Sequence, residues 1–286
     1  MEKQVLIANK PLISVIIPTY NRGEALARML GYLNAQSYLD FEVLVVVDGS
    51  TDHTLEVLAV QQTDMPNLNY FYQENQGILR AREAGFNLSR GRYLLFVDDD
   101  DWIHTAALEK LAKVIREVEP DLIYFGFHET RDGVKTEFKP RVIKEFFNLS
   151  SFAYWSKCIR KGHFEECVNF AELPSISYLE DNITLLLGLD SPEISVIEDI
   201  LYHRLLTEDS HSACLRDKYC DDFKILYEYF IHFFSRSQLL GEYQNALTLY
   251  FYMHKQHVER RGSSAMISRF EEFETLFLPL IPKEEH

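Results

Sequence analysis

Residues 93–102 read YLLFVDDDDW, an apolar run that ends in four consecutive aspartates. Short, nearly continuous apolar runs rich in Val, Ile, Phe and Tyr predict buried strands. Further runs of this kind stand at residues 13–17, 41–47, 69–72 and 122–127. Stretches with helical spacing separate them, at residues 23–36, 52–62, 78–89 and 105–119. This alternation predicts an α/β fold, with a mostly parallel sheet and helices on both of its faces.

The second half of the chain has a different pattern. The turn at Gly133 predicts a small hairpin in an otherwise irregular region. Beyond about residue 206 only helical spacing occurs, at residues 218–234, 243–258 and 265–277. We therefore expect a ligand-binding domain over 1–205 and a helical region over 206–286. The aromatic residues of the helical region are expected mainly to pack, while an acceptor groove, a dimer contact and a membrane-facing patch stay open for them.

Charge and composition exclude several classes of function. The net charge of −15, without a large basic patch, argues against a nucleic-acid partner. No run of about 18 apolar residues and no signal-like start occur, so we expect a cytoplasmic protein. Contact with the inner face of the membrane would be peripheral, through a modest basic patch formed by Lys255, His257, Arg260 and Arg261. The irregularly spaced cysteines predict reduced thiols rather than disulfides or a zinc site.

Ligands of such sheets bind outside the carboxyl ends of the strands, so the loops that follow the strands are the first candidates. The strand EVLVVVD ends at Asp48, whose carboxylate can accept hydrogen bonds from a nucleobase or a ribose. Asp52, in the same loop, is expected instead to cap the following helix, and Ser50 can do the same. After SVIIP, Asn21 and Gly23 favour a turn or a helix start.

The four-aspartate run needs an explanation of its own, because adjacent carboxylates are costly unless positive charge lies among them. Mg²⁺ and Mn²⁺ prefer oxygen ligands, and Mg²⁺ uses only one or two protein carboxylates plus substrate phosphates. Residues two apart on an extended backbone point the same way, so Asp98 and Asp100 can face one ligand together. The alternative is a solvated acidic turn that caps the helix from Thr105. The position after a buried strand favours the metal site.

Four stretches in this order resemble the family 2 glycosyltransferases of the GT-A fold: SVIIPTYNR, VVDGSTDHT, ENQGILRAREAG and YLLFVDDDDW. The resemblance covers the first 205 residues and implies the type of enzyme that builds bacterial surface polysaccharide, such as capsule or O-antigen, or lipooligosaccharide. It implies that Pro18 and Tyr20 border the base of the nucleotide and that Asp48 binds uracil. Val47 departs from the family pattern, which usually has a first acid at this position.

The same resemblance implies roles for the remaining charged residues of these stretches. Arg80 or Arg82 would help to line the nucleotide pocket. Asp98 would touch ribose or sugar, and Asp100 would hold the Mn²⁺ or Mg²⁺ that bridges the diphosphate. The division of these contacts among Asp98, Asp99 and Asp100 stays open.

A base for the acceptor is expected in one of two Glu-Asp pairs. The resemblance implies an inverting displacement, in which a carboxylate takes the proton of the acceptor hydroxyl. Asp181, at the head of the apolar run NITLLLGL, matches the family's Glu-Asp motif and is the preferred base. Asp199, expected in a surface turn, is the rival. Further on, Arg204 suits a diphosphate contact, since its fork meets pairs of oxygens; His203, Ser210 and Ser212 are weaker candidates.

The expected activity is transfer of a hexose or N-acetylhexosamine from a UDP-sugar to a glycan or lipid-linked glycan acceptor, by a monomer or a homodimer. A nucleotidyltransferase would need a basic, Gly-rich loop, and no G-x-x-x-x-G-K occurs. No G-x-G-x-x-G follows a strand, which argues against a dehydrogenase. A catalytically inactive nucleotide-sugar-binding scaffold stays open as the alternative from another class.

Overall fold

The computed structural model describes residues 10–140, 153–177, 179–188, 192–206 and 217–281. The chain divides into two compact units, each of which is described by itself. The first takes in the chain up to Val142, with Ser150–Val168 and Thr184–Leu205. The second includes Asn169–Ile183 and the chain from Leu206 onward.

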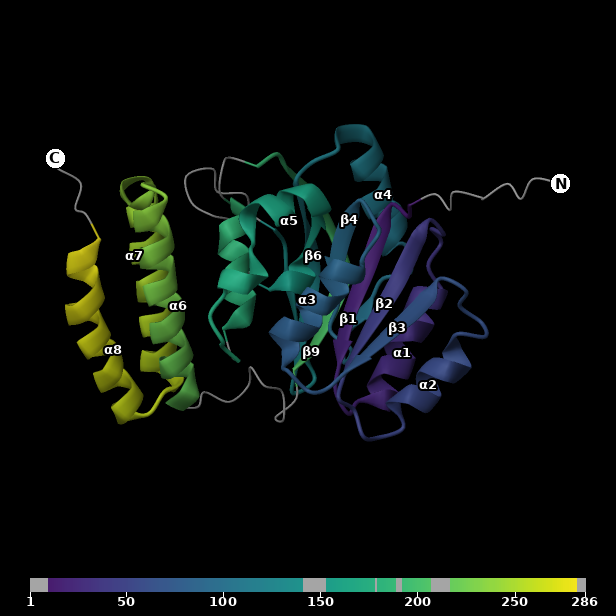
Figure 1. The fold of residues 1–286 in the computed structure, drawn as a ribbon, viewed down its shortest axis with the longest axis horizontal. Helices are drawn as coiled ribbons and strands as arrows, with labels where there is room; N and C mark the ends of the chain where they lie inside the picture. Colours follow the sequence, from purple (N-terminus) through teal and green to yellow (C-terminus); the bar gives the residue numbers. More distant parts are fainter. Residues whose placement is uncertain (1–9, 141–152, 178, 189–191, 207–216, 282–286) are drawn as a thin grey trace. The chain divides into compact units, whose positions relative to one another are not determined.

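A mixed sheet forms the centre of the first unit (Figure 1). Its strands are β1 Ile13–Thr19, β2 Phe41–Asp48, β3 Leu68–Gln73, β4 Tyr93–Phe96, β5 Trp102–Ile103, β6 Leu122–Arg131, β7 Val134–Phe138, β8 Lys157–Arg160 and β9 Ile194–Leu206. They lie in the order β3-β2-β1-β4-β8-β6-β9-β5, with β7 paired to β6. β1 pairs in parallel with β2 and β4, and β2 with β3. The predicted α/β fold is therefore confirmed.

The antiparallel part of the sheet was only partly predicted. The expected hairpin at Gly133 is confirmed as β6 and β7, in which Phe127 lies opposite Phe138. The sequence pattern did not indicate β5, β8 and β9, which pair antiparallel with β9, with β4 and β6, and with β5, respectively.

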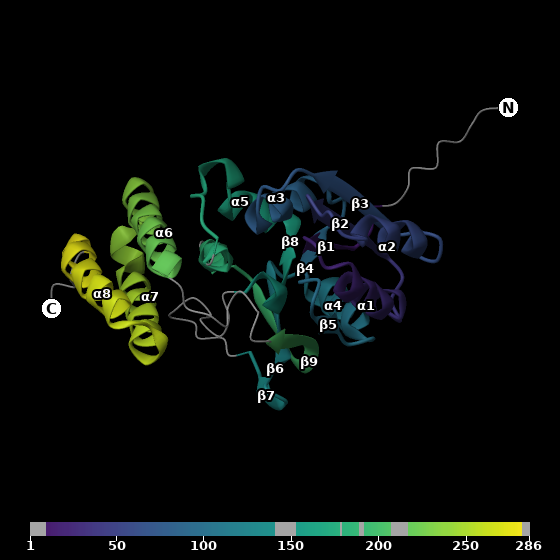
Figure 2. The ribbon, with the colours of Figure 1, turned by 90° about the horizontal axis from the view of Figure 1, so that it is seen from below.

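Helices cover both faces of the sheet (Figure 2). α3 Ile78–Leu88 and α5 Lys161–Cys167 lie on one face, and α1 Gly23–Asn34 and α4 Ala107–Val118 lie on the other; α2 Thr54–Gln61 packs beside α1. Side chains alternate along a strand. Val15 therefore joins the core cluster with Leu26 and Leu108, while Ile16 faces α3. There, a Cβ on Gly85 would stand 2.4 Å from Cγ2 of Ile16, so only glycine allows this close approach.

The second unit is built from α6 Asp217–Arg236, α7 Leu240–Arg261 and α8 Ser264–Phe277, which confirms the three helices expected there. Its aromatic side chains pack among these helices. The ring of Phe223 on α6 lies 4.6 Å from that of Phe270 on α8 and 5.7 Å from that of Phe251 on α7. None of the helices in the described ranges is long and apolar enough to cross a membrane.

Acid is expected to destabilise this helical unit through His254. The side chain is buried beside Tyr219, whose Oη lies 2.5 Å from its Nδ1, and burial lowers the pKa of His254 to about 3. Because the unfolded chain takes up this proton first, the free energy of unfolding falls as the pH drops from about 6.5, by at most about 1.4 kcal/mol per pH unit. Urea unfolding followed by helical circular dichroism at about pH 7.5 and about pH 5 measures this loss.

His254→Gln provides the control, because glutamine keeps a hydrogen-bonding group for Tyr219 but does not titrate. The loss of stability between the two pH values should be smaller in this variant. An equal loss in the variant and the wild type would show that another group is responsible.

Candidate functional site

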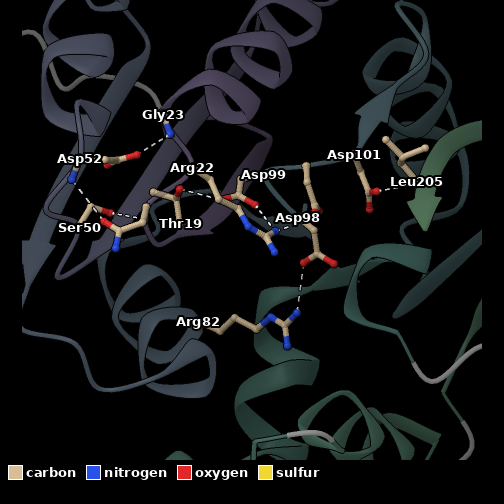
Figure 3. Close-up of polar contacts among 12 residues, drawn as sticks. Thr19, Arg22, Gly23, Ser50, Asp52, Arg82, Asp98, Asp99, Asp101 and Leu205 are labelled. Carbon is tan, nitrogen blue, oxygen red and sulfur yellow. Dashed lines mark hydrogen bonds and ion pairs between the residues drawn. The ribbon is translucent and has the colours of Figure 1, made fainter. Parts of the chain in front are cut away.

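The four aspartates follow β4 at the carboxyl edge of the parallel strands (Figure 3). Their side chains alternate between half-buried and buried positions. The side chains of Asp98 and Asp100 are 28% and 34% exposed, whereas that of Asp99 is 5% exposed. Asp101 is buried as well. Asp98 and Asp100 are thus the two carboxylates that a ligand in solvent can reach.

Thr19, at the end of β1, and Arg22, just before α1, contact the middle of the run. Nη1 of Arg22 lies 3.0 Å from Oδ1 of Asp99 and 2.6 Å from Oδ2 of Asp100. The hydroxyl of Thr19 donates to Oδ2 of Asp99 at 2.6 Å. Burial raises the pKa of Asp99 to about 7, against the opposing effects of Arg22 and Thr19. The sequence pattern predicted no contact with the aspartates for either residue, although both belong to the stretch PTYNR.

Arg82 approaches the run from α3. It is buried, its Nη2 lies 3.3 Å from Oδ1 of Asp98, and its guanidinium lies over the ring of Tyr154 at 4.6 Å. Arg80, the other arginine expected to line the nucleotide pocket, forms an ion pair with Glu83 at 2.7 Å. The structure therefore brings Arg82 to the aspartate run.

β9 fixes the far end of the run through Asp101. The hydroxyl of Tyr202 donates to Oδ2 of Asp101 at 2.7 Å and accepts the N–H of Asp98 at 3.1 Å, and the N–H of Leu205 donates to Oδ1 of Asp101. Burial, followed by the charges of Asp98 and Asp100, raises the pKa of Asp101 well above its usual range. A single buried tyrosine thus sets the backbone position from which Asp98 projects.

Removing the Tyr202 hydroxyl is expected to destabilise the first unit. Tyr202→Phe leaves a buried carboxylate and a backbone N–H each short of one partner, which costs about 1–3 kcal/mol. Urea unfolding measures this loss. Tyr38→Phe, at a partly buried tyrosine whose hydroxyl contacts exposed groups, is the matched control and should cost less. Equal stability of Tyr202→Phe and the wild type would contradict this role of the hydroxyl.

Asp48 ends β2 and is buried, with both carboxylate oxygens turned towards the segment after β3. Oδ1 accepts hydrogen bonds from Nε2 of Gln73 and the N–H of Gln76, and Oδ2 accepts one from the N–H of Gly77, all at 2.8–2.9 Å. Gly77 has a φ of 88°, in the left-handed region that favours glycine. Asp48 therefore fixes the loop that leads into α3, and a contact with a nucleobase would be additional to this role.

The loops after β1 and β2 are tied together by two side chains. Oδ1 of Asn21 accepts the N–H of Thr51 at 2.7 Å, and Asp52 accepts the N–H of both Gly23 and Thr54, the first residues of α1 and α2. Asp52 was expected to cap α2, but the N-cap is His53, and Asp52 contacts the first N–H of the helix from one residue earlier. Although burial opposes the shift, the hydrogen bonds of Thr54 and Gly23 lower the pKa of Asp52.

The two residues expected beside the base differ in exposure. Pro18 is buried opposite Val46, next to the carboxyl end of β1. Tyr20 is 49% exposed, just beyond the strand. An exposed aromatic ring at the carboxyl edge can stack on a flat ligand.

The two candidates for the acceptor base lie in different surroundings. Asp181 stands in the first turn of the 3-10 helix η3 Glu180–Gly188, in the part of that helix that belongs to the second unit. The match to the family's Glu-Asp motif is the reason for considering it as the base. Asp199 was expected in a surface turn, and this was wrong. It occupies an exposed position in β9 and forms an ion pair with Lys110 at 2.8 Å.

Arg204 also lies in β9. It forms an ion pair with Glu129 at 3.2 Å and lies over the ring of Trp155. Its neighbour His203 stacks on Trp102, with ring centroids 5.2 Å apart. Ser210 and Ser212 lie outside the described residues.

The donor chemistry of Asp98 and Asp100 fits a divalent cation. In the ranges that the structure covers, no three His, Cys, Asp or Glu side chains are grouped so as to hold a metal ion. Hard cations such as Mg²⁺ commonly take only one or two protein carboxylates, and substrate phosphates complete the coordination. Asp98 and Asp100 meet this requirement, because both are reachable from solvent and project from one turn.

Two glycosyltransferases of known sequence are similar to this chain. GlyA, a glycosyltransferase of Streptococcus pneumoniae, is 28% identical over 228 residues, which are 72% of this chain and 32% of that protein. GlyG, a glycosyltransferase of the same organism, is 31% identical over 126 residues, which are 43% of this chain and 42% of that protein. The chain thus spans less than half the length of either relative.

Solved structures share the fold. The structure of S. aureus TarS residues 1–349 in complex with UDP-GlcNAc superimposes with a TM-score of 0.78 at 20% identity, covering 94% of this chain and 81% of that TarS 1–349 chain. The mannosyltransferase PcManGT from Pyrobaculum calidifontis, in complex with GDP-Man and Mn²⁺, gives a TM-score of 0.57 at 14% identity, covering 96% and 83% of the two chains. The expected GT-A fold is confirmed. Residues 14–171, more than half of the chain, match the sequence model of one family, and the chain therefore belongs to glycosyl transferase family 2.

Proposed function

We propose that this chain is an inverting glycosyltransferase that moves a hexose or N-acetylhexosamine from a UDP-sugar to a glycan acceptor. The observation that carries the proposal is the group of residues at the carboxyl edge of the sheet. There, Asp98 and Asp100 face solvent while Arg82 and Arg22 hold one oxygen of each. Proteins of similar fold hold nucleotide sugars, UDP-GlcNAc in TarS and GDP-Man with Mn²⁺ in PcManGT.

The donor would lie along this edge. Pro18, Tyr20 and Asp48 would form the base pocket, with Arg80 and Arg204 as further candidates for donor contacts. Asp98, oriented by Arg82, would accept hydrogen bonds from ribose or sugar hydroxyls. Asp99 faces Thr19 and Arg22, so in this proposal it orients Arg22 and does not contact the donor.

Asp100, helped by Asp98, would hold a Mn²⁺ or Mg²⁺ ion. Such an ion, when bound with the donor, neutralises the negative charge that develops on the departing diphosphate. The two protein carboxylates would hold such an ion next to β4. The remaining ligands would be oxygens of the diphosphate and water.

Asp181 would take the proton of the acceptor hydroxyl as it attacks. A hydroxyl has a high pKa, so a positioned carboxylate is needed at the moment of attack. Glycans of the bacterial surface, free or linked to lipid, are the proposed acceptors. We place the reaction in the cytoplasm or at the inner face of the membrane, and we leave a homodimer as an option for the helical region.

A panel of UDP-sugars, with GDP-mannose as the control for the base, tests the proposal through release of the nucleoside diphosphate in the presence of Mn²⁺. At least one UDP-sugar should give metal-dependent release. Binding of UDP without hydrolysis or transfer of any donor would instead support a scaffold. Release from GDP-mannose alone would contradict the uridine assignment.

A further inference from the structure

Arg22 occupies the position at which a cation would meet Asp100. One nitrogen, Nη1, contacts carboxylate oxygens of two aspartates, at 3.0 Å for Asp99 and 2.6 Å for Asp100. The charges of Asp99 and Asp100 outweigh the effect of burial and raise the pKa of Arg22. The guanidinium therefore serves as the counter-ion of this part of the run.

The backbone at Arg22 is firmly held while its side chain has room to move. Asn21, with a φ of 52°, is anchored to the neighbouring loop through Thr51 and Ser50. Gly23 is anchored through Asp52. The side chain of Arg22 itself is 42% exposed. It can leave Asp100 without any change in the loop.

The two contacts of Arg22 differ in strength. Asp99 is buried and also receives the Thr19 hydroxyl, so its environment is fixed. Asp100 is partly exposed, and an ion pair between two partly exposed groups is weak. A divalent ion at Asp100 would repel the guanidinium and compete for the same carboxylate. Displacement from Asp100 alone is therefore the least costly rearrangement.

We propose that Arg22 holds Asp100 until cation and diphosphate enter together. This inference rests on the proposed function. The guanidinium competes with a lone cation, so the cation alone binds weakly. When a diphosphate is present, the freed N–H groups of Arg22 bind its oxygens, since a guanidinium fork matches such oxygen pairs. Cation and nucleotide thereby strengthen each other's binding, and this coupling is reciprocal.

Titration of the full chain with Mn²⁺, followed by electron paramagnetic resonance of the free ion, tests the inference without any turnover. The titration is run with and without UDP. In the absence of UDP, Arg22→Gln should bind Mn²⁺ roughly two- to fivefold more tightly than the wild type, the range expected for loss of one partly exposed ion pair. The factor by which UDP raises the Mn²⁺ affinity should be smaller in this variant.

Arg28→Gln is the matched control, because it makes the same charge change at an exposed position of α1, the helix that Arg22 precedes. Its Mn²⁺ affinity should stay close to that of the wild type. Arg22→Lys keeps the charge but lacks the fork, and should lie between Arg22→Gln and the wild type. It also provides a second variant if the glutamine variant does not fold.

Equal Mn²⁺ affinities of Arg22→Gln and Arg28→Gln would overturn the inference, because general charge would then explain the effect. An undiminished effect of UDP in the Arg22 variants would overturn it as well. In both cases the proposed function stands. Absence of Mn²⁺ binding to the wild type at every UDP concentration would instead remove the metal site itself, and the inference with it.

Discussion

Asp100→Ala is expected to abolish the Mn²⁺-dependent part of UDP-sugar binding, with a loss in affinity of at least about 100-fold. Asp100 is one of two carboxylates of the run that solvent reaches. Its removal takes away the ligand that would join the cation to the protein. Isothermal calorimetry with UDP, in the presence and absence of Mn²⁺, measures the loss.

The fold should survive this change, because the side chain is partly exposed and Asp99 still pairs with Arg22. Asp64→Ala, at an exposed aspartate after α2, is the matched control and should leave UDP binding unchanged. Wild-type affinity for UDP and Mn²⁺ in Asp100→Ala would mean that the aspartate run is the solvated acidic turn considered above.

Asp181→Asn is expected to keep the affinity for UDP and to slow transfer by about 10³-fold. The amide has nearly the shape of the carboxylate but cannot take up the proton of the acceptor hydroxyl. Steady-state transfer to an acceptor, measured beside UDP calorimetry, separates loss of chemistry from loss of binding.

Asp199→Asn is the comparison variant for the base. Asp199 lies in β9 and pairs with Lys110, so its replacement should leave transfer nearly unchanged. Full activity of Asp181→Asn would remove that residue from the mechanism. Loss of transfer in Asp199→Asn alone would instead identify Asp199 as the base for the acceptor hydroxyl.

The central parallel strands could be predicted from the sequence because burial on both faces makes them nearly continuously apolar. Every residue of β1 and β2 is buried, and Val, Ile and Leu fill most of their positions. β5 has two residues, and β9 mixes buried, half-buried and exposed positions without regular alternation. These strands exist through pairing with each other, Trp102 with His203 and Ile103 with Tyr202. A local pattern does not contain such long-range pairing.

Part of the site could also be predicted, because the side chains of an extended backbone alternate in direction. The two-residue period correctly separated Asp98 and Asp100 from their buried neighbours. The partners of the run were not predictable, since Arg22, Arg82 and Tyr202 come from three other elements. The sequence pattern also did not predict the three hydrogen bonds that the carboxylate of Asp48 accepts from residues 73–77.

A crystal structure of the chain with UDP and Mn²⁺, with the metal located by anomalous scattering, would show directly whether Asp100 binds the cation. We predict a manganese peak within roughly 2.5 Å of an Asp100 oxygen, shared with the diphosphate, and Arg22 displaced from Asp100. UDP bound elsewhere, or a manganese peak away from the aspartate run with Arg22 still on Asp100, would contradict the account.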